Sequence, residues 1–293
     1  MKRSGRASEA WRWLREHAVN IVAGLVVLYL LIPIAVIFFF SFNDPAGRYN
    51  FTWVSFTFEH WGNAFGLPDL NSAMVTSLKL AALATLISTA IGTLMALGLV
   101  RYAFFGRRAA NFLIVVPMAT PEVVMGAALL SFFLIVNAFE LGFQTLLIAH
   151  VMFCISFVVV VVRSRLIGFD RNLEEAAQDL GATPLQTFRL VTLPLIMPGI
   201  VGGALLAFAL SIDDFVISNF NSGTTVTFPL YIFGAAQRGI PVEVNVIAMM
   251  LFAATVAAMG FATWQQRRAE RLASMRPEQE SAPVPMPGSA AAT

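Results

Sequence analysis

Between two long apolar segments, the chain reads Glu175-Ala176-Ala177-Gln178-Asp179-Leu180-Gly181 and, after nine intervening residues, Val191-Thr192-Leu193-Pro194. The first part carries apolar residues at positions i, i+3, i+4 and i+7, which are Leu173, Ala176, Ala177 and Leu180. That spacing predicts a short helix with one apolar face, and Gly181 favours a break at its end. The sequence therefore predicts a polar insert with an apolar side that can dock against another surface.

A second short helix is predicted directly after this break. Thr183 suits an N-cap and Pro184 suits the first helical position. Leu185 and Phe188 then fall at i and i+3 and project from the same side. Two short helices joined at a bend make a docking knob. The alternative is an amphipathic loop that lies on a membrane surface.

The composition is that of an integral membrane protein. Hydrophobic residues make up 58% of the chain and charged residues 12%, whereas soluble domains carry about 25% charged residues. A membrane span needs about 20 mainly apolar residues. We predict six spans, at residues 21–42, 72–100, 111–139, 144–162, 195–217 and 244–264. The third is long enough to tilt or to hold an interfacial turn, and Pro117 and Pro121 should kink it.

The basic residues indicate how these spans are oriented. Sixteen of the 19 Lys and Arg residues flank the N-terminus or follow the second, fourth and sixth spans. The other three are Arg48, Arg238 and Lys79, which lie toward the opposite side. Because basic loops stay in the cytoplasm, both termini and the polar insert are predicted to be cytoplasmic. The basic charge thus reflects membrane orientation and not nucleic-acid binding, since no compact basic domain is present.

Several chemistries have no motif in this chain. The phosphate-binding pattern Gly-x4-Gly-Lys-Ser/Thr is absent from the sequence. If the chain takes part in transport driven by ATP, another chain must therefore bind and hydrolyse the ATP. His150 and Cys154 share a face of the fourth span, but two ligands do not make a metal site, and bundle packing is favoured. We predict no enzyme activity, no metal and no cofactor in the chain itself.

Acidic residues at membrane depth are expensive and usually face a bundle interior or a water-filled pathway. Asp213 and Asp214 end the apolar run of the fifth span, and Asn219 follows closely. Glu122 lies inside the third span after two prolines. A pathway lined by carboxylates, amides and aromatic rings suits an organic cation as substrate, because ammonium groups pair with carboxylates and are attracted to aromatic faces. The alternative is structural: the aspartates cap the membrane exit, and Glu122 pairs within the bundle.

The polar insert resembles the EAA loop of ABC-transporter permeases. That family has Glu-Ala-Ala, three residues, Gly, nine residues, an aliphatic residue, one residue and Leu-Pro, and Val191 stands here where the family often has Ile. The resemblance implies that the loop docks into a groove on a separate ATPase subunit. The residues that it assigns to coupling are Glu175, Ala176, Ala177, Gly181, Leu185, Phe188, Leu193 and Pro194.

A narrower resemblance covers about residues 25–259. Segment 211–218 is similar to the Ser-Leu-Asp-Asp segment of spermidine/putrescine permeases, and segments 121–124, 227–232 and 241–245 also resemble that subfamily. This implies a permease of a polyamine importer, with Asp213, Asp214, Glu122 and Asn219 along the substrate pathway. It also implies a second homologous permease, a dimer of ATPases that carry ATP and Mg, and an extracytoplasmic polyamine-binding protein.

The expected fold is all-α, with six transmembrane helices in the type I ABC importer (MetI-like) arrangement, embedded in the lipid of a bacterial cytoplasmic membrane. A short helix is expected at 229–238 on the outer face. The expected order is a cytoplasmic segment (1–20), a first transmembrane helix with an outer loop (21–71), a five-helix core (72–264) with its coupling loop at about 163–194, and a disordered cytoplasmic tail (265–293). Two alternatives stay open. The substrate could be another cation or small solute, such as ferric iron or thiamine, or the chain could be a secondary transporter that works alone.

Overall fold

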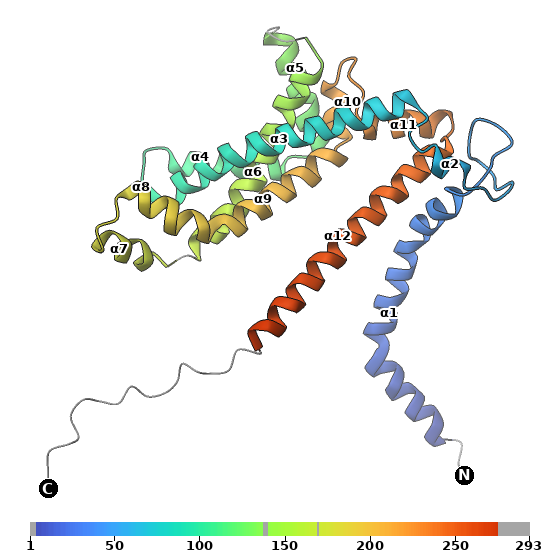
Figure 1. The fold of residues 1–293 in the computed structure, drawn as a ribbon, viewed down its shortest axis with the longest axis horizontal. Coiled ribbons are helices and arrows are strands. Elements are labelled where there is room, and N and C mark those ends of the chain that lie inside the picture. Colours follow the sequence, from blue (N-terminus) through green and yellow to red (C-terminus); the bar gives the residue numbers. More distant parts are fainter. Residues whose placement is uncertain (1–3, 137–139, 169, 275–293) are drawn as a thin grey trace. The chain divides into compact units, whose positions relative to one another are not determined.

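The computed structural model describes residues 4–136, 140–168 and 170–274, and Figure 1 labels its helices. Within these ranges the chain is helical, apart from connecting loops and an isolated β-bridge between Asn43 and Phe56. The chain divides into two compact units. The core unit is Phe65–Pro241. The terminal unit consists of the N-terminal segment that ends at Ala64 and the C-terminal segment that begins at Val242.

Three long helices pack together in the core unit. They are α3 (Pro68–Arg101), α6 (Phe143–Ile167) and α9 (Leu193–Asp213). Small residues allow this close packing: a Cβ atom added to Gly92 of α3 would lie 2.8 Å from the Val158 side chain of α6. Gly203 of α9 faces the same valine: a Cβ atom added to Gly203 would lie 3.5 Å from the Cα atom of Val158. Membrane helices commonly associate through such small residues.

Shorter helices complete the core unit. They are α4 (Arg107–Ala119), α5 (Glu122–Val136), α7 (Asn172–Asp179), α8 (Pro184–Thr187), the π-helical turn η1 (Phe188–Thr192), α10 (Val216–Asn221) and α11 (Phe228–Arg238). The last confirms the short helix expected at 229–238. Backbone N–H of Phe228 at its start donates to Ser77 Oγ of α3 (2.8 Å), which fixes α11 to the bundle.

The third predicted span is broken and not merely kinked. Helices α4 and α5 meet at 111° around Thr120 and Pro121. Proline disfavours helical geometry in the residue before it, and Thr120 is extended, with φ −80° and ψ 132°. Pro117 lies inside α4 without ending it. The predicted end of this span at Phe139 lies outside the described residues.

The terminal unit contains α1 (Ser4–Phe40), α2 (Glu59–Gly62) and α12 (Val242–Ser274). Val242 and Val246 of α12 are buried against Ala64, with Trp61 packed beside them. His60 Nδ1 lies 3.4 Å from Glu243 Oε1. These contacts join α12 to the segment around α2.

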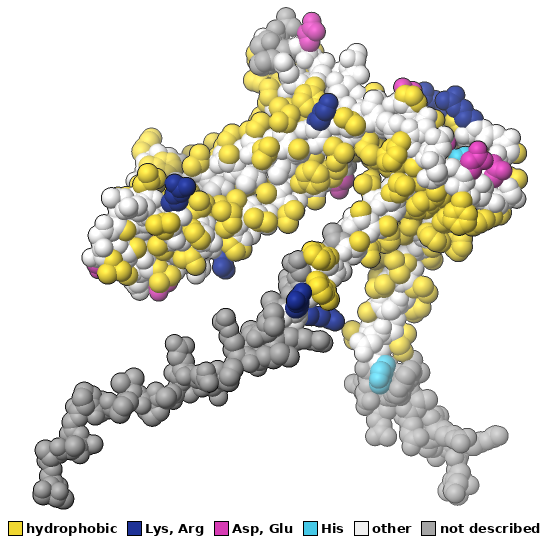
Figure 2. All heavy atoms as spheres, viewed as in Figure 1, with side chains coloured by type: hydrophobic (Ala, Val, Ile, Leu, Met, Phe, Trp, Pro, Cys, Tyr) yellow, Lys and Arg dark blue, Asp and Glu magenta, His cyan; other side chains and the backbone are white. Residues whose placement is uncertain are grey.

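The apolar helices agree with the predicted membrane class. Five helices of the described chain are long and apolar enough to cross a membrane, and the bent α4–α5 pair makes a sixth if it counts as one span. Hydrophobic side chains cover much of the surface in Figure 2, and charged ones are few. The fifth span ends as a helix at Asp213, short of the predicted residue 217. The tail predicted to be disordered begins at residue 265, but α12 continues to Ser274, and the rest of the tail lies outside the described residues.

Candidate coupling and transport sites

The polar insert forms the predicted pair of short helices, with its apolar side chains exposed. Leu180 is 90% exposed and Leu185 is 75% exposed. Gly181, between the two helices, has φ +89°, a left-handed conformation that glycine adopts without strain. Backbone N–H of Gly181 donates to Gln178 O (2.8 Å), and that of Ala182 donates to Ala177 O (3.0 Å). The turn thus satisfies the last carbonyls of α7 and redirects the chain.

The second short helix begins with the expected cap. Thr183 Oγ1 accepts the backbone N–H of Gln186 (3.4 Å), and Gln186 Oε1 accepts the backbone N–H of Thr183 (2.8 Å). This reciprocal capping box holds the start of α8. Between the two helices lies a hollow of about 420 Å³, lined by Ala177, Leu180, Gly181, Ala182, Gln186, Thr187, Leu190 and Val191. The insert therefore offers both an exposed apolar edge and a recess of side-chain size.

Glu174, and not Glu175, anchors the insert to the bundle. Its carboxylate pairs with the guanidinium of Arg101 at the end of α3 through two contacts. It also accepts a hydrogen bond from the hydroxyl of Thr192, the last residue of η1. Glu175 is exposed. Sequence reasoning missed this anchor because Arg101 lies 73 residues away along the chain.

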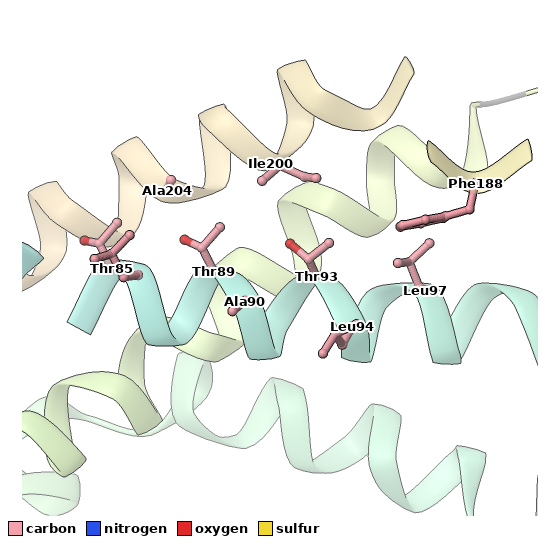
Figure 3. Close-up of a pocket in the computed structure, with 10 residues that line it drawn as sticks. Thr85, Thr89, Ala90, Thr93, Leu94, Leu97, Phe188, Ile200 and Ala204 are labelled. Carbon is pink, nitrogen blue, oxygen red and sulfur yellow. The ribbon is translucent and has the colours of Figure 1, made fainter. Parts of the chain in front are cut away.

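The remaining residues assigned to coupling lie at the base of α9. Leu193 is half-buried and Pro194 is exposed. Phe188 turns away from the exposed edge, toward Leu97 of α3 (Figure 3). Backbone N–H of Leu193 donates to Phe188 O, five residues earlier, which makes η1 a wide π turn. Single π turns inside longer helices are often found at functional sites.

Phe188 closes one end of a groove between α3 and α9. The groove has a volume of about 460 Å³ and is lined by Thr85, Leu86, Thr89, Ala90, Thr93, Leu94, Leu97, Phe188, Ile200 and Ala204. Its three threonines lie one turn apart on α3 (Figure 3). Their hydroxyl oxygens are covered and have no hydrogen-bond partner within the described chain. The groove is apolar except for this row of hydroxyls.

At the opposite end of α9, the structure separates the two neighbouring aspartates. Asp213 is the last residue of the helix and is exposed. Asp214 is only 8% exposed. Its Oδ1 accepts the backbone N–H of Ile217 (3.3 Å), and its Oδ2 accepts that of Ser218 (2.8 Å). Asp214 therefore caps the start of α10, and Asp213 is the exposed carboxylate of the pair.

Asp214 also belongs to a buried polar cluster. His150 of α6 places Nδ1 at 2.8 Å from Ser211 Oγ, Nε2 at 3.1 Å from Ser218 Oγ, and Nε2 at 3.5 Å from Asp214 Oδ2. We call His150, Ser211, Asp214 and Ser218 the histidine cluster. Cys154, one turn along α6, donates to Ala207 O (3.5 Å). No group of three or more His, Cys, Asp or Glu side chains in the described part of the chain could hold a metal ion.

Two further residues of the predicted pathway are exposed. Glu122 begins α5 at the break after Pro121, and Asn219 lies in the middle of α10. Neither side chain makes a hydrogen bond or ion pair with Asp213 or Asp214 in the described structure. The structure thus brings Asp214 together with His150 and does not join the four predicted pathway residues into one contact network.

The sequence of this chain is similar to those of known transport proteins. Residues 88–271 match the family described as binding-protein-dependent transport system inner membrane component. The spermidine/putrescine transport system permease protein PotC of Haemophilus influenzae is 38% identical over 234 residues, which cover 80% of this chain and 90% of that protein. The putrescine transport system permease protein PotI of Escherichia coli is 38% identical over 261 residues, which cover 86% of this chain and 91% of that protein.

Solved structures share the fold. A chain of a bacterial ABC transporter involved in the import of the acidic polysaccharide alginate aligns with a TM-score of 0.62 and 19% identity, over 91% of this chain and 98% of that one. A chain of an amino acid ABC transporter aligns with a TM-score of 0.56 and 19% identity, over 73% of this chain and 100% of that one. At this identity the likeness bears on the fold alone.

Proposed function

Because the chain belongs to the family of binding-protein-dependent transport system inner membrane components, we propose that it is a permease subunit of an ATP-driven polyamine importer. The expected type I importer (MetI-like) permease fold agrees with the solved relatives, and a multi-span member of this family lies in the inner membrane. The chain forms one half of the translocation pathway, and a second, homologous permease forms the other half.

The observation that carries the coupling role is the insert of α7 and α8. It exposes large apolar side chains on a loop that the basic residues predict to be cytoplasmic, and such exposure favours a protein partner. The anchor formed by Glu174 with Arg101 and Thr192 ties that loop to the end of α3 and to η1, which leads directly into α9. A displacement of the loop by the ATPase would therefore move the ends of two membrane helices together. The partner is a dimer of ATPases, which bind ATP and Mg, since the chain has no phosphate-binding loop of its own.

The substrate class rests on the relatives named above for spermidine and putrescine, and the site chemistry supports it. Asp213 stands exposed at the C-terminal end of α9. The C-terminus of a helix carries partial negative charge and favours cations, so the carboxylate and the helix end act together on an ammonium group. An extracytoplasmic binding protein delivers the polyamine to this end of the bundle.

The direct test is uptake of labelled putrescine and spermidine in cells that lack their own polyamine importers. The chain is expressed with the second permease, the ATPase and the binding protein of its own system. We expect uptake that needs ATP hydrolysis, is competed by unlabelled polyamines, and is unaffected by thiamine or ferric iron. Uptake of either of those solutes instead would assign a different substrate, and transport by this chain alone would overturn the subunit assignment.

The orientation is tested by cysteine labelling on a background with Cys154 replaced by alanine. With both termini cytoplasmic, a cysteine at Gln186 in α8 should react only in permeabilised cells. A cysteine at Arg48, which is exposed in the loop after α1, should react from outside intact cells. The reverse pattern would invert the topology and place the insert where no cytoplasmic ATPase can reach it.

A further inference from the structure

His150 is buried in the core unit, with 1% of its surface exposed. Its two ring nitrogens lie within hydrogen-bond distance of two serine hydroxyls, one on each side of the break between α9 and α10. A neutral imidazole has one donor and one acceptor, and a hydroxyl can serve as either, so both nitrogens are satisfied. The ring thus acts as a bridge across the point where the helix is interrupted.

Asp214 lies inside the break that this bridge spans. The first N–H groups of a helix have no partner within it, and the Asp214 carboxylate accepts two of them at the start of α10. A buried carboxylate is costly unless it is hydrogen-bonded. The backbone N–H groups of Ile217 and Ser218 and the Ser218 hydroxyl supply those hydrogen bonds, and the imidazole of His150 lies beside the carboxylate at 3.5 Å. This carboxylate is therefore occupied within the protein.

The far end of α10 is held independently. Thr145 Oγ1 of α6 donates to Asn221 O (2.8 Å), and Asn221 Nδ2 donates to Gly126 O of α5 (3.3 Å). Phe220 packs so closely on Gly126 that an added Cβ atom there would lie 2.7 Å from its ring. With its end fixed on α5 and α6, α10 depends on the histidine cluster for the placement of its start.

We propose that His150 is a positioning residue for transport: by bridging Ser211 and Ser218 and contacting Asp214, it sets the break so that Asp213 alone is presented to the substrate. His150 does not touch the substrate itself. The nature of that substrate rests on the proposed function, but the positioning role rests on the geometry of the cluster. The charged group in contact with His150 is Asp214, and the other titratable neighbour on α6 is Cys154.

The first arm of the test measures the uptake kinetics of the full transporter. His150→Leu removes both hydrogen bonds, whereas His150→Gln keeps an amide that can bridge the two hydroxyls. We expect His150→Leu to raise the KM for putrescine about tenfold with the maximal rate per assembled complex nearly unchanged, and His150→Gln to recover most of the loss. Ser156→Ala, at a buried serine of α6 outside the cluster, should behave like the unmodified protein.

The second arm measures the position of α10 without transport. On the Cys154→Ala background, a cysteine at Ser222, which is 7% exposed just after α10, should resist an impermeant thiol reagent and become reactive when His150→Leu is added. A cysteine at the exposed Asn219 should react in both. Unchanged KM and unchanged labelling in His150→Leu would overturn the positioning role. If the unmodified complex takes up no polyamine, the proposed function fails, and the labelling arm still decides the role of His150.

Discussion

The two ends of the core unit differ in which side chains they expose and which they bury. At the insert, large leucines stand in solvent, while the Glu174 carboxylate is held by the bundle. At the break between α9 and α10, the polar groups of the histidine cluster are buried, and one carboxylate, that of Asp213, stays outside. The insert thus leaves an apolar surface that the proposed ATPase would cover, whereas the polar groups at the break are satisfied by side chains of the chain itself.

This difference separates residues that act through a partner from residues that act through the fold. A change to an exposed leucine of the insert leaves the chain itself nearly as stable, because little buried surface is lost. A change in the histidine cluster leaves a buried polar group without its partner, which destabilises the chain directly. The predictions below test this separation, from the largest expected effect to the smallest.

The largest effect is expected from the adjacent aspartates. Asp214→Ala leaves the N–H groups of Ile217 and Ser218 without their acceptor, and should lower the free energy of unfolding of the purified complex by about 3 kcal/mol. Asp213→Ala should leave stability within about 0.5 kcal/mol but reduce polyamine uptake strongly. Thermal denaturation and uptake would be measured on both. Equal behaviour of the two variants would remove the distinction between an inner and an outer carboxylate.

The next effect concerns the anchor of the insert. Glu174→Arg or Arg101→Glu places like charges together, and each should reduce substrate-stimulated ATP hydrolysis by about tenfold, since a charge-assisted hydrogen bond of this kind contributes about 1.5–3 kcal/mol. The double variant restores opposite charges and should recover part of the activity. Glu175→Arg, at the exposed neighbour, serves as the control. A double variant no better than either single one would mean that the pair does not transmit the motion.

A smaller effect is expected at Gly181. Valine at φ +89° costs about 1–2 kcal/mol of backbone strain, so Gly181→Val should loosen the bend and weaken ATPase association in a pull-down assay. Gly106 offers a matched control, because it also has φ +89° and nothing within 4 Å of an added Cβ atom, yet lies between α3 and α4. If Gly106→Val weakens association as much, the effect belongs to general strain and not to the insert.

The smallest effect is expected from Leu180→Ser. Because the side chain is exposed and lines the hollow of the insert, its loss should leave the melting temperature of the chain unchanged. It should weaken ATPase binding by about fivefold, which corresponds to about 1 kcal/mol at an interface. Gln178→Ser, at an exposed position near the end of α7, is the control. Lower stability without weaker binding would mean that this leucine serves the fold.

Local sequence signals predicted much of what the structure contains. Apolar runs located the membrane helices, and Thr183, Pro184 and Gly181 marked the two short helices of the insert, because caps and breaks depend on a few adjacent residues. The break near Pro121 was predicted as a kink, but its angle was not. Proline disrupts the helix on its own, whereas the direction that follows depends on packing against other helices.

Contacts between distant segments could not be predicted in the same way. Glu174 looked no different from Glu175 until the end of α3 was placed beside it, and Asp213 looked no different from Asp214. Both distinctions depend on which side chain faces a neighbouring helix, and a shift of one residue on a helix turns a side chain by about 100°. His150 was read as a packing residue, and its serine partners lie 61 and 68 residues away.

The π turn at η1 inserts one extra residue into a helix that is otherwise regular on both sides. An α-helix closes its rings four residues back, and here the ring from Leu193 reaches five back to Phe188, so one residue is surplus to the repeat. A surplus residue in a continuous helix can migrate, because each step exchanges one backbone hydrogen bond for another of the same kind. Each step would rotate the residue that the turn passes by about 100° around the helix axis, while the helices on either side keep their relative orientation. A side chain at this joint would therefore meet a different neighbour after such a step, while the insert stays continuous with α9.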